Sequence, residues 1–303
     1  MRPARRLTTI MAALTLTLVS RHLTAQQAGT LRCGTGIHPG EDVGFVAVPE
    51  GDLFCPLTAD PKDAHSFMTF SRGDFPTLPE LENDTDVGSV GLADRFNFVR
   101  WGGPAPGDGI QMGISGGVFA QFDLRAASFD LINADYVVGL PVTFRRSAFS
   151  LRFRPYHQSS HLGDEFILRQ GDLERENLSF EALELILSQE AGPLRVYGGG
   201  EWLFRREPEV LEDLLAHAGA EIRAGSLYGL RFVAAVDMKS TEEHDWSPAW
   251  SARAGVELAV WRDNGHPPRQ WQILVEFYDG PAPYGQFFQE SLRWFGLGVH
   301  FSL

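Results

Sequence analysis

The sequence is poor in cysteine, in long apolar runs and in positive charge, and each shortage excludes a class of protein. Two cysteines in 303 residues are too few for a disulfide scaffold. No apolar run reaches the roughly 20 residues of a membrane-spanning helix, which excludes a helical membrane protein. A net charge of -13 argues against nucleic-acid binding, which requires a basic face. The 44% of hydrophobic residues are too many for a disordered chain.

Residues 1–25 have the features of a secretory signal peptide. Three arginines lie among the first six residues, residues 10–19 are apolar, and Ala25 offers a cleavage point. We therefore expect export from the cytoplasm. Outside the cytoplasm Cys33 and Cys55 can close a disulfide, and the alternative is two free thiols.

From about Val87 onward, apolar residues alternate with polar or small ones in short segments. One segment has its apolar positions at Tyr228, Leu230, Phe232, Ala234, Val236 and Met238. Arg231 and Asp237 lie between them, on the opposite parity. A period of two is typical of a β-strand with two unlike faces, and no segment after Val87 has a convincing helical period. The pattern therefore predicts an all-β chain.

Two all-β architectures fit this pattern. A soluble barrel or sandwich hides its apolar face inside, whereas a membrane barrel turns that face to lipid. The chain end favours the second, because apolar residues alternate up to the last position, at Phe295, Leu297, Val299, Phe301 and Leu303. Such a terminal strand resembles the assembly signal of bacterial outer-membrane barrels. The resemblance implies localisation in the bacterial outer membrane, contact with outer-membrane lipid and recognition by the barrel-assembly machinery.

The connections between the predicted strands differ in length on the two sides of the sheet. On the side of the C-terminus they are short, at residues 263–268, 224–226, 190–193 and 146–147. On the other side they are longer, at residues 279–291, 239–248, 206–214 and 161–177. Short periplasmic turns and long external loops are typical of a membrane barrel. Eleven strands follow residue 86, and a strand near Ser66–Ser71 supplies a twelfth.

We therefore predict a closed antiparallel transmembrane β-barrel of about 12 strands (10–12), formed by residues 66–303. A periplasmic N-terminal extension, residues 26–65, precedes it. Charged residues with inward parity include Arg152, Arg154, Glu184, Arg195, Glu201, Arg205, Arg231, Arg253 and Glu257. Charges taken out of water need partners, and both signs occur on neighbouring strands. We expect a filled lumen rather than an open pore, and no nucleic-acid partner.

Four passages resemble a family of bacterial outer-membrane proteins known as domain of unknown function 1207. They are Leu53–Asp60 (LFCPLTAD), Val90–Asp94 (VGLAD), Tyr156–Glu165 (YHQSSHLGDE) and Phe277–Gln286 (FYDGPAPYGQ). The resemblance runs from about residue 45 to the chain end and covers most of the chain. It implies a membrane barrel and carries no established activity.

Within the third passage, the pair His157-x-Ser159 resembles the His-x-Ser motif of outer-membrane phospholipase A, and lipid A deacylase barrels use a similar pair. In those enzymes both residues lie on the lipid-facing side of one strand, where the His takes the proton of the Ser hydroxyl. The resemblance implies that Ser159 is the nucleophile, His157 the base and Asn177 the residue that orients the His. Ser179 and Glu181 share the parity of Asn177 and are substitutes for it.

The parity and depth of the pair agree with this resemblance. Phe149 and Phe153 are apolar, lipid-facing positions, and His157 and Ser159 have the same parity. The topology puts the pair at the external end of its strand, within reach of outer-leaflet lipid. Pro155 cannot donate to the ladder, and a bulge there would reverse the parity of the residues that follow it.

In the phospholipase, calcium helps to form the oxyanion site, and Asp164 and Glu165 are the nearest oxygen ligands here. A metal site built from His157, His161, Asp164 and Glu165 is an alternative, as is an ordered loop base without chemistry. The best specific hypothesis is a lipid-facing Ser/His acyl hydrolase similar to phospholipase A. The competing class is a non-enzymatic barrel, which would be a narrow channel, a receptor or a structural outer-membrane protein.

Overall fold

The computed structural model describes residues 44–75, 85–105, 107–170, 177–227, 230–260 and 269–301. The predicted signal peptide, residues 1–25, and Cys33 lie outside these ranges. Cys55, the other cysteine of the sequence, is disulfide-bonded. In the described ranges no helix is both long and apolar enough to cross a membrane.

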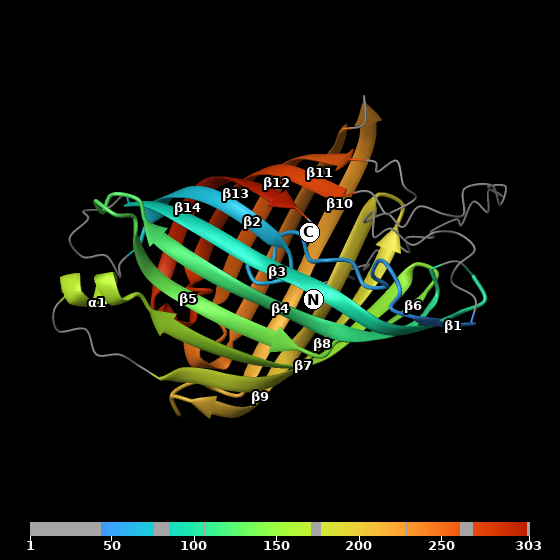
Figure 1. The fold of residues 1–303 in the computed structure, drawn as a ribbon, viewed down its shortest axis with the longest axis horizontal. Coiled ribbons are helices and arrows are strands. Elements are labelled where there is room, and N and C mark those ends of the chain that lie inside the picture. Colours follow the sequence, from blue (N-terminus) through green and yellow to red (C-terminus); the bar gives the residue numbers. More distant parts are fainter. Residues whose placement is uncertain are drawn as a thin grey trace, which may run out of the picture.

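The described residues form fourteen strands and three short helices (Figure 1). The strands are β1 (Gly44–Ala47), β2 (Ser66–Asp74), β3 (Thr85–Gly102), β4 (Gly109–Asp123), β5 (Asp130–Gly139), β6 (Val142–Arg146), β7 (Phe149–Leu162), β8 (Leu178–Ala191), β9 (Leu194–Glu207), β10 (Leu214–Leu227), β11 (Leu230–Thr241), β12 (Pro248–Val260), β13 (Arg269–Pro281) and β14 (Ser291–Phe301). The helices are α1 (Asp164–Gln170), η1 (Glu242–His244) and η2 (Gly285–Phe287).

The fourteen strands occupy twelve positions around a closed antiparallel barrel. Strands β7 to β14 pair in chain order, and β14 closes the barrel against β2, with Phe301 opposite Ser66. β5 and β6 lie end to end between β4 and β7, and β1 pairs with the part of β3 that extends beyond β2. The predicted fold class is confirmed, and β2 is the strand expected near Ser66–Ser71.

The barrel is apolar outside and charged inside. On β14, Phe295 and Leu297 are more than half exposed, whereas Trp294 and His300, which have the opposite parity, are buried. Buried charged residues of the wall include Arg152, Glu184, Arg195, Glu201, Arg253 and Glu257. An apolar outer surface around a polar interior is the pattern of a barrel surrounded by lipid.

The two ends of the barrel carry different connections. At one end, here called the short-turn end, the β6–β7 and β8–β9 turns use Ser147 (φ 56°) and Gly192 (φ 61°). Both residues adopt the left-handed conformation that tight hairpin turns require. The other end, here called the long-loop end, carries α1, η1 and η2. The short and long connections therefore fall at opposite ends, as predicted.

Residues 48–65, here called the plug, run inside the barrel. Leu53, Phe54 and Leu57 of the plug are at most 2% exposed. Wall residues that donate hydrogen bonds to plug backbone carbonyls include Arg145 of β6, Arg195 of β9 and Arg253 of β12. Because these strands lie far apart around the barrel, a segment that contacts all of them must lie in the lumen.

The expected periplasmic extension, residues 26–65, thus needs a correction for its described part from residue 48 on. That part lies in the lumen and not outside the barrel. Buried guanidinium groups have lost water and need hydrogen-bond acceptors, and the plug supplies them from its backbone and its carboxylates. The parity of the strands predicted the charged interior, but it gave no sign that a separate segment would pair with it.

Candidate functional site

The first candidate site lies on the outer surface of the barrel at the long-loop end. The pairing of β7 with β8 runs without a register shift from Phe149 to Ser160, so Pro155 introduces no bulge there. His157 and Ser159 therefore keep the outward parity of Phe153 and are partly exposed. Gln158 and Ser160, on the opposite parity, face the lumen and are buried.

A carboxylate from the next strand contacts the histidine. Glu181 lies directly opposite His157 in the ladder, and the Nδ1–H of His157 donates to Glu181 Oε1 at 3.2 Å. The His157 side chain is 40% exposed. Within the described residues the Ser159 hydroxyl makes no hydrogen bond to His157 or to any other group. The site therefore holds a His–carboxylate pair, with a serine two residues away on the same face.

Asn177 does not contact the histidine. It lies just before β8, and its side-chain amide donates to Glu207 at the end of β9. Of the three residues with suitable parity, Glu181 is the one that reaches His157. The sequence leaves this choice open, because the long connection between β7 and β8 does not fix which residue lies opposite His157.

A third charged residue completes a row across three strands. Glu181 pairs with Arg205 of β9, and Arg205 Nε lies 3.8 Å from Glu181 Oε2. The prediction that Arg205 faces the lumen is wrong, because its side chain is 81% exposed on the outer surface. The register of β9 shifts by one residue here, so that Glu181 pairs with Arg205 and Ala182 with Leu203. A bulge of this kind reverses the parity of the residues after it.

The residues suggested as metal ligands do not form a metal site. Asp164 and Glu165 are exposed in the first turn of α1. No group of three or more His, Cys, Asp or Glu side chains suited to a metal occurs among the described residues. Arg169 at the end of α1 pairs with Asp123 and Asp130 and not with these two acids. The carboxylates present therefore do not fit calcium, and no step of the chemistry below passes through a metal.

On the opposite face of β7, Ser160 belongs to a buried cluster of hydrogen bonds with Asp135 and Lys62, here called the polar lock. Its hydroxyl donates to the buried carboxylate of Asp135 on β5, which also accepts from Lys62 of the plug. Residues 282–290, here called the cap, connect β13 to β14. Their backbone donates to the same lock, from Gly285 N to Asp135 Oδ2 and from Gln286 N to Ser160 Oγ, both at 3.1 Å. One wall carboxylate therefore joins the plug to the cap.

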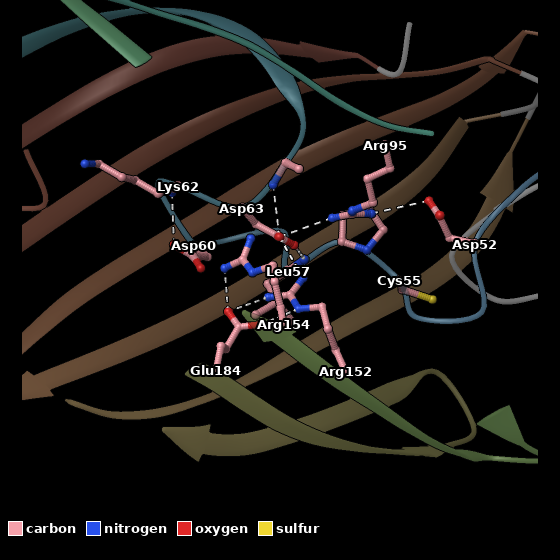
Figure 2. A network of polar contacts seen from close by, with 12 residues as sticks. Asp52, Cys55, Leu57, Asp60, Lys62, Asp63, Arg95, Arg152, Arg154 and Glu184 are labelled. Carbon is pink, nitrogen blue, oxygen red and sulfur yellow. Dashed lines mark hydrogen bonds and ion pairs between the residues drawn. The ribbon is translucent and has the colours of Figure 1, made fainter. Parts of the chain in front are cut away.

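The plug is held deeper in the lumen by a second network, shown in Figure 2. Asp63 lies between Arg152 and Arg95, at 2.8 and 3.1 Å, and Glu184 binds Arg152 from the other side. Burial alone would raise the pKa of Asp63. Arg152, Arg95 and Arg154 outweigh burial and hold that pKa well below its ordinary value. Asp63 is therefore ionised at neutral pH and neutralises the buried Arg152 and the largely buried Arg95.

A cavity of about 160 Å³ remains between the plug and the cap. The plug contributes Asp60 and Lys62 to its lining, and the cap contributes Tyr284 and Phe288. Asp60 is paired with Lys239 of the wall and Lys62 with Asp135, so these charges are already neutralised. The predicted filled lumen agrees with this arrangement of plug, cap and side chains.

The architecture places the molecule in a recognisable class, the outer-membrane type of β-barrel. Outer membrane phospholipase A from Escherichia coli has a similar fold, with a TM-score of 0.53, 14% identity, and coverage of 82% of this chain and 93% of the other. The calcium-bound dimer of the Salmonella typhi phospholipase has the same TM-score and coverage at 13% identity. At these identities the likeness concerns the fold alone.

The chain belongs to the family described as protein of unknown function (DUF1207), whose model matches residues 40–303. The resemblance drawn from the four sequence passages is thereby confirmed. No curated protein matches the sequence.

Proposed function

We propose that this protein is an acyl hydrolase of the bacterial outer membrane that attacks lipid esters from its outer surface. The observation that carries the proposal is the outward-facing contact of His157 Nδ1 with Glu181, with Ser159 two residues along the same face. An ionised carboxylate only accepts hydrogen bonds, so this contact puts the proton of a neutral imidazole on Nδ1. Nε2 is then left as the base.

The reaction follows from these roles. Ser159 Oγ attacks the carbonyl carbon of the ester while His157 Nε2 takes the hydroxyl proton. The tetrahedral intermediate expels the alcohol, which receives that proton, and an acyl-serine remains. Water then gives a proton to His157 and attacks the acyl-serine, which releases the fatty acid and restores Ser159. Glu181 touches no reacting atom and serves as the positioning residue of His157.

The separation of Ser159 from His157 in the free protein does not count against this chemistry. Catalytic hydrogen bonds are often long in a protein without substrate and tighten in the complex. Rotation of the Ser159 side chain about its Cα–Cβ bond can bring its hydroxyl towards a histidine that already lies on the same face. The outward aim of both side chains suits a substrate that arrives from lipid.

We also infer the orientation in the membrane. The short-turn end faces the periplasm and the long-loop end faces the outside, as the lengths of the connections favour. The terminal strand β14, apolar on its outer face, is the part that the assembly machinery would recognise. Heat-modifiable gel mobility of the protein in outer-membrane fractions tests this, and recovery of the protein only in the soluble fraction would contradict it.

The activity is tested by fatty-acid release from phospholipid in neutral-detergent micelles. Ser159→Ala and His157→Ala are expected to lower kcat by roughly 10³-fold or more. The matched controls are Ser291→Ala, an exposed serine at the long-loop end of β14, and His161→Ala, which shares the strand and face of His157. Both controls should keep the wild-type rate.

For Glu181, we expect Glu181→Ala to lower kcat with little change in KM, and Glu181→Asp to restore part of the loss. Equal rates for wild type and Ser159→Ala would reject the hydrolase and favour the non-enzymatic alternative. The plug and cap count against a channel among those alternatives, and planar-bilayer conductance of the wild type measures this directly.

A further inference from the structure

We propose that Arg205 binds the phosphate of the lipid headgroup and makes the site selective for phosphate-bearing acyl lipids. This inference rests on the proposed function, because it assigns a substrate class to the same outer-surface site. It is carried by a different observation from the His157–Glu181 contact, because the bulge in β9 brings a guanidinium group to the outer surface beside His157 and Glu181.

The bulge has a specific effect on one side chain. Without it, Arg205 would follow the parity of Glu201 and Leu203, which are buried on the inner face. The extra residue in β9 turns Arg205 outward, in register with Glu181 and therefore with His157. Bulges are common next to active sites, where they re-aim a side chain.

The guanidinium group of Arg205 is largely free to bind a ligand. Its side chain is 81% exposed, and its contact within the described residues is the long one to Glu181, at 3.8 Å. A guanidinium carries five N–H donors, and a planar fork of them matches two oxygens of a phosphate. The acidic groups that face it are Glu181 and Glu207, which are in contact with His157 and Asn177.

The depth of Arg205 agrees with a headgroup. Trp202 and Phe204 precede it on β9, are both 49% exposed on the outer surface, and lie with ring centroids 6.0 Å apart. Exposed tryptophan and other aromatic residues mark the boundary between the apolar and polar layers of a membrane. Arg205 follows them towards the long-loop end, where the phosphates of the outer leaflet lie.

The spacing also suits a single lipid molecule. His157 and Arg205 are separated by two strand spacings, about 10 Å in all. The long side chain of Arg205 shortens this gap. One lipid can therefore present its phosphate to Arg205 and an ester near its glycerol to Ser159.

The test compares two substrates with the same acyl chains in neutral-detergent micelles, phosphatidylglycerol and diacylglycerol. Arg205→Gln is expected to raise KM for phosphatidylglycerol roughly tenfold or more, with kcat unchanged, and to leave both constants for diacylglycerol unchanged. Arg205→Lys should restore part of the loss. A third arm with lipid A separates a glycerophospholipid from a phosphorylated glycolipid as the source of the phosphate.

Arg293→Gln is the matched control. Arg293 is also exposed at the outward long-loop end, and it pairs with Asp279 of the neighbouring strand as Arg205 does with Glu181. If Arg293→Gln changes KM as much as Arg205→Gln, or if Arg205→Gln affects both substrates equally, the assignment is overturned.

Binding of the two lipids to Ser159→Ala, with and without Arg205→Gln, separates this inference from the proposed function. Hydrolysis of neither lipid by the wild type would defeat the proposed function. Preferential binding of phosphatidylglycerol that is lost with Arg205→Gln would still support Arg205. Equal binding of phosphatidylglycerol and diacylglycerol, with and without Arg205→Gln, would overturn the role of Arg205.

Discussion

Ser159 and Ser160 are neighbours on β7, yet they face opposite sides of the barrel wall and have opposite surroundings. Ser160 is buried, donates to Asp135 and accepts from the cap. Ser159 faces outward beside His157 and makes no hydrogen bond within the described residues. The comparison extends to the acids, because Asp135 bridges plug and cap inside the barrel, whereas Glu181 contacts His157 and Arg205 on the outer surface.

The two faces of the barrel wall therefore give the same residue type opposite surroundings. Inside, buried polar groups such as Ser160 and Asp135 bind one another, and removal of one leaves its partner buried without water. Outside, Ser159 has no hydrogen-bond partner among the described residues, so its removal should cost little stability. Inner-face variants should therefore change stability, whereas outer-face variants should change activity.

The largest effect on stability is expected from the inner network. Asp63→Ala leaves Arg152 and Arg95 buried without their shared carboxylate, and breaking such a pair costs about 3–5 kcal/mol. Urea unfolding in lipid vesicles, followed by tryptophan fluorescence, measures the loss. Asp52→Ala is the matched control, because Asp52 also pairs with Arg95 but is partly exposed. A loss below about 1 kcal/mol for Asp63→Ala would show that the plug is not held by this network.

Low pH should lower the free energy of unfolding through the same network, although by less than Asp63→Ala does. The pKa of Asp63 is lower in the folded protein than in the unfolded chain, so its stabilisation is complete above the unfolded value, about 4. It is lost as the pH falls from there through the folded value. The free energy of unfolding, measured between pH 7 and pH 2, should therefore decrease below about pH 4. This decrease should be smaller in Asp63→Asn, and an equal decrease in Asp63→Asn would assign it to other groups.

The next largest effect on stability is expected from a variant of the polar lock. Ser160→Ala removes a donor from Asp135 and an acceptor from Gln286 N, at an expected cost of about 1–3 kcal/mol. The cap should also become more open to added protease from the long-loop side. Activity at the outer surface is expected to stay at the wild-type level. A loss of activity larger than the loss of folded protein would contradict the separation of the two faces.

The smallest effect on stability is expected for Ser159→Ala. An outward-facing serine without a hydrogen bond should change the unfolding free energy by less than about 0.5 kcal/mol. The same unfolding assay measures it, with Ser160→Ala beside it as the matched inner-face variant. A loss of unfolding free energy as large as that of Ser160→Ala would show that Ser159 stabilises the fold, and would contradict the difference between Ser159 and Ser160.

Strand alternation and export features were enough to predict the barrel, its number of strands and the outward aim of His157 and Ser159. Two findings needed the three-dimensional structure, for physical reasons. The position of the plug depends on contacts between residues 48–65 and strands far away in the sequence, such as Arg253 with the carbonyl of Thr58. The outward turn of Arg205 depends on one extra residue in β9, which alternation cannot show.

The choice between Asn177 and Glu181 was open in the sequence because both have the required parity. The register decided it, since Glu181 lies directly opposite His157 whereas Asn177 lies beyond the paired residues and binds Glu207.

The most direct test is covalent labelling of the folded protein with a lipid-like fluorophosphonate, followed by peptide mass spectrometry. An activated serine at the outer surface should give one adduct, on Ser159, that disappears in His157→Ala and persists in His161→Ala. An adduct on Ser160, or equal labelling of wild type and His157→Ala, would contradict the account.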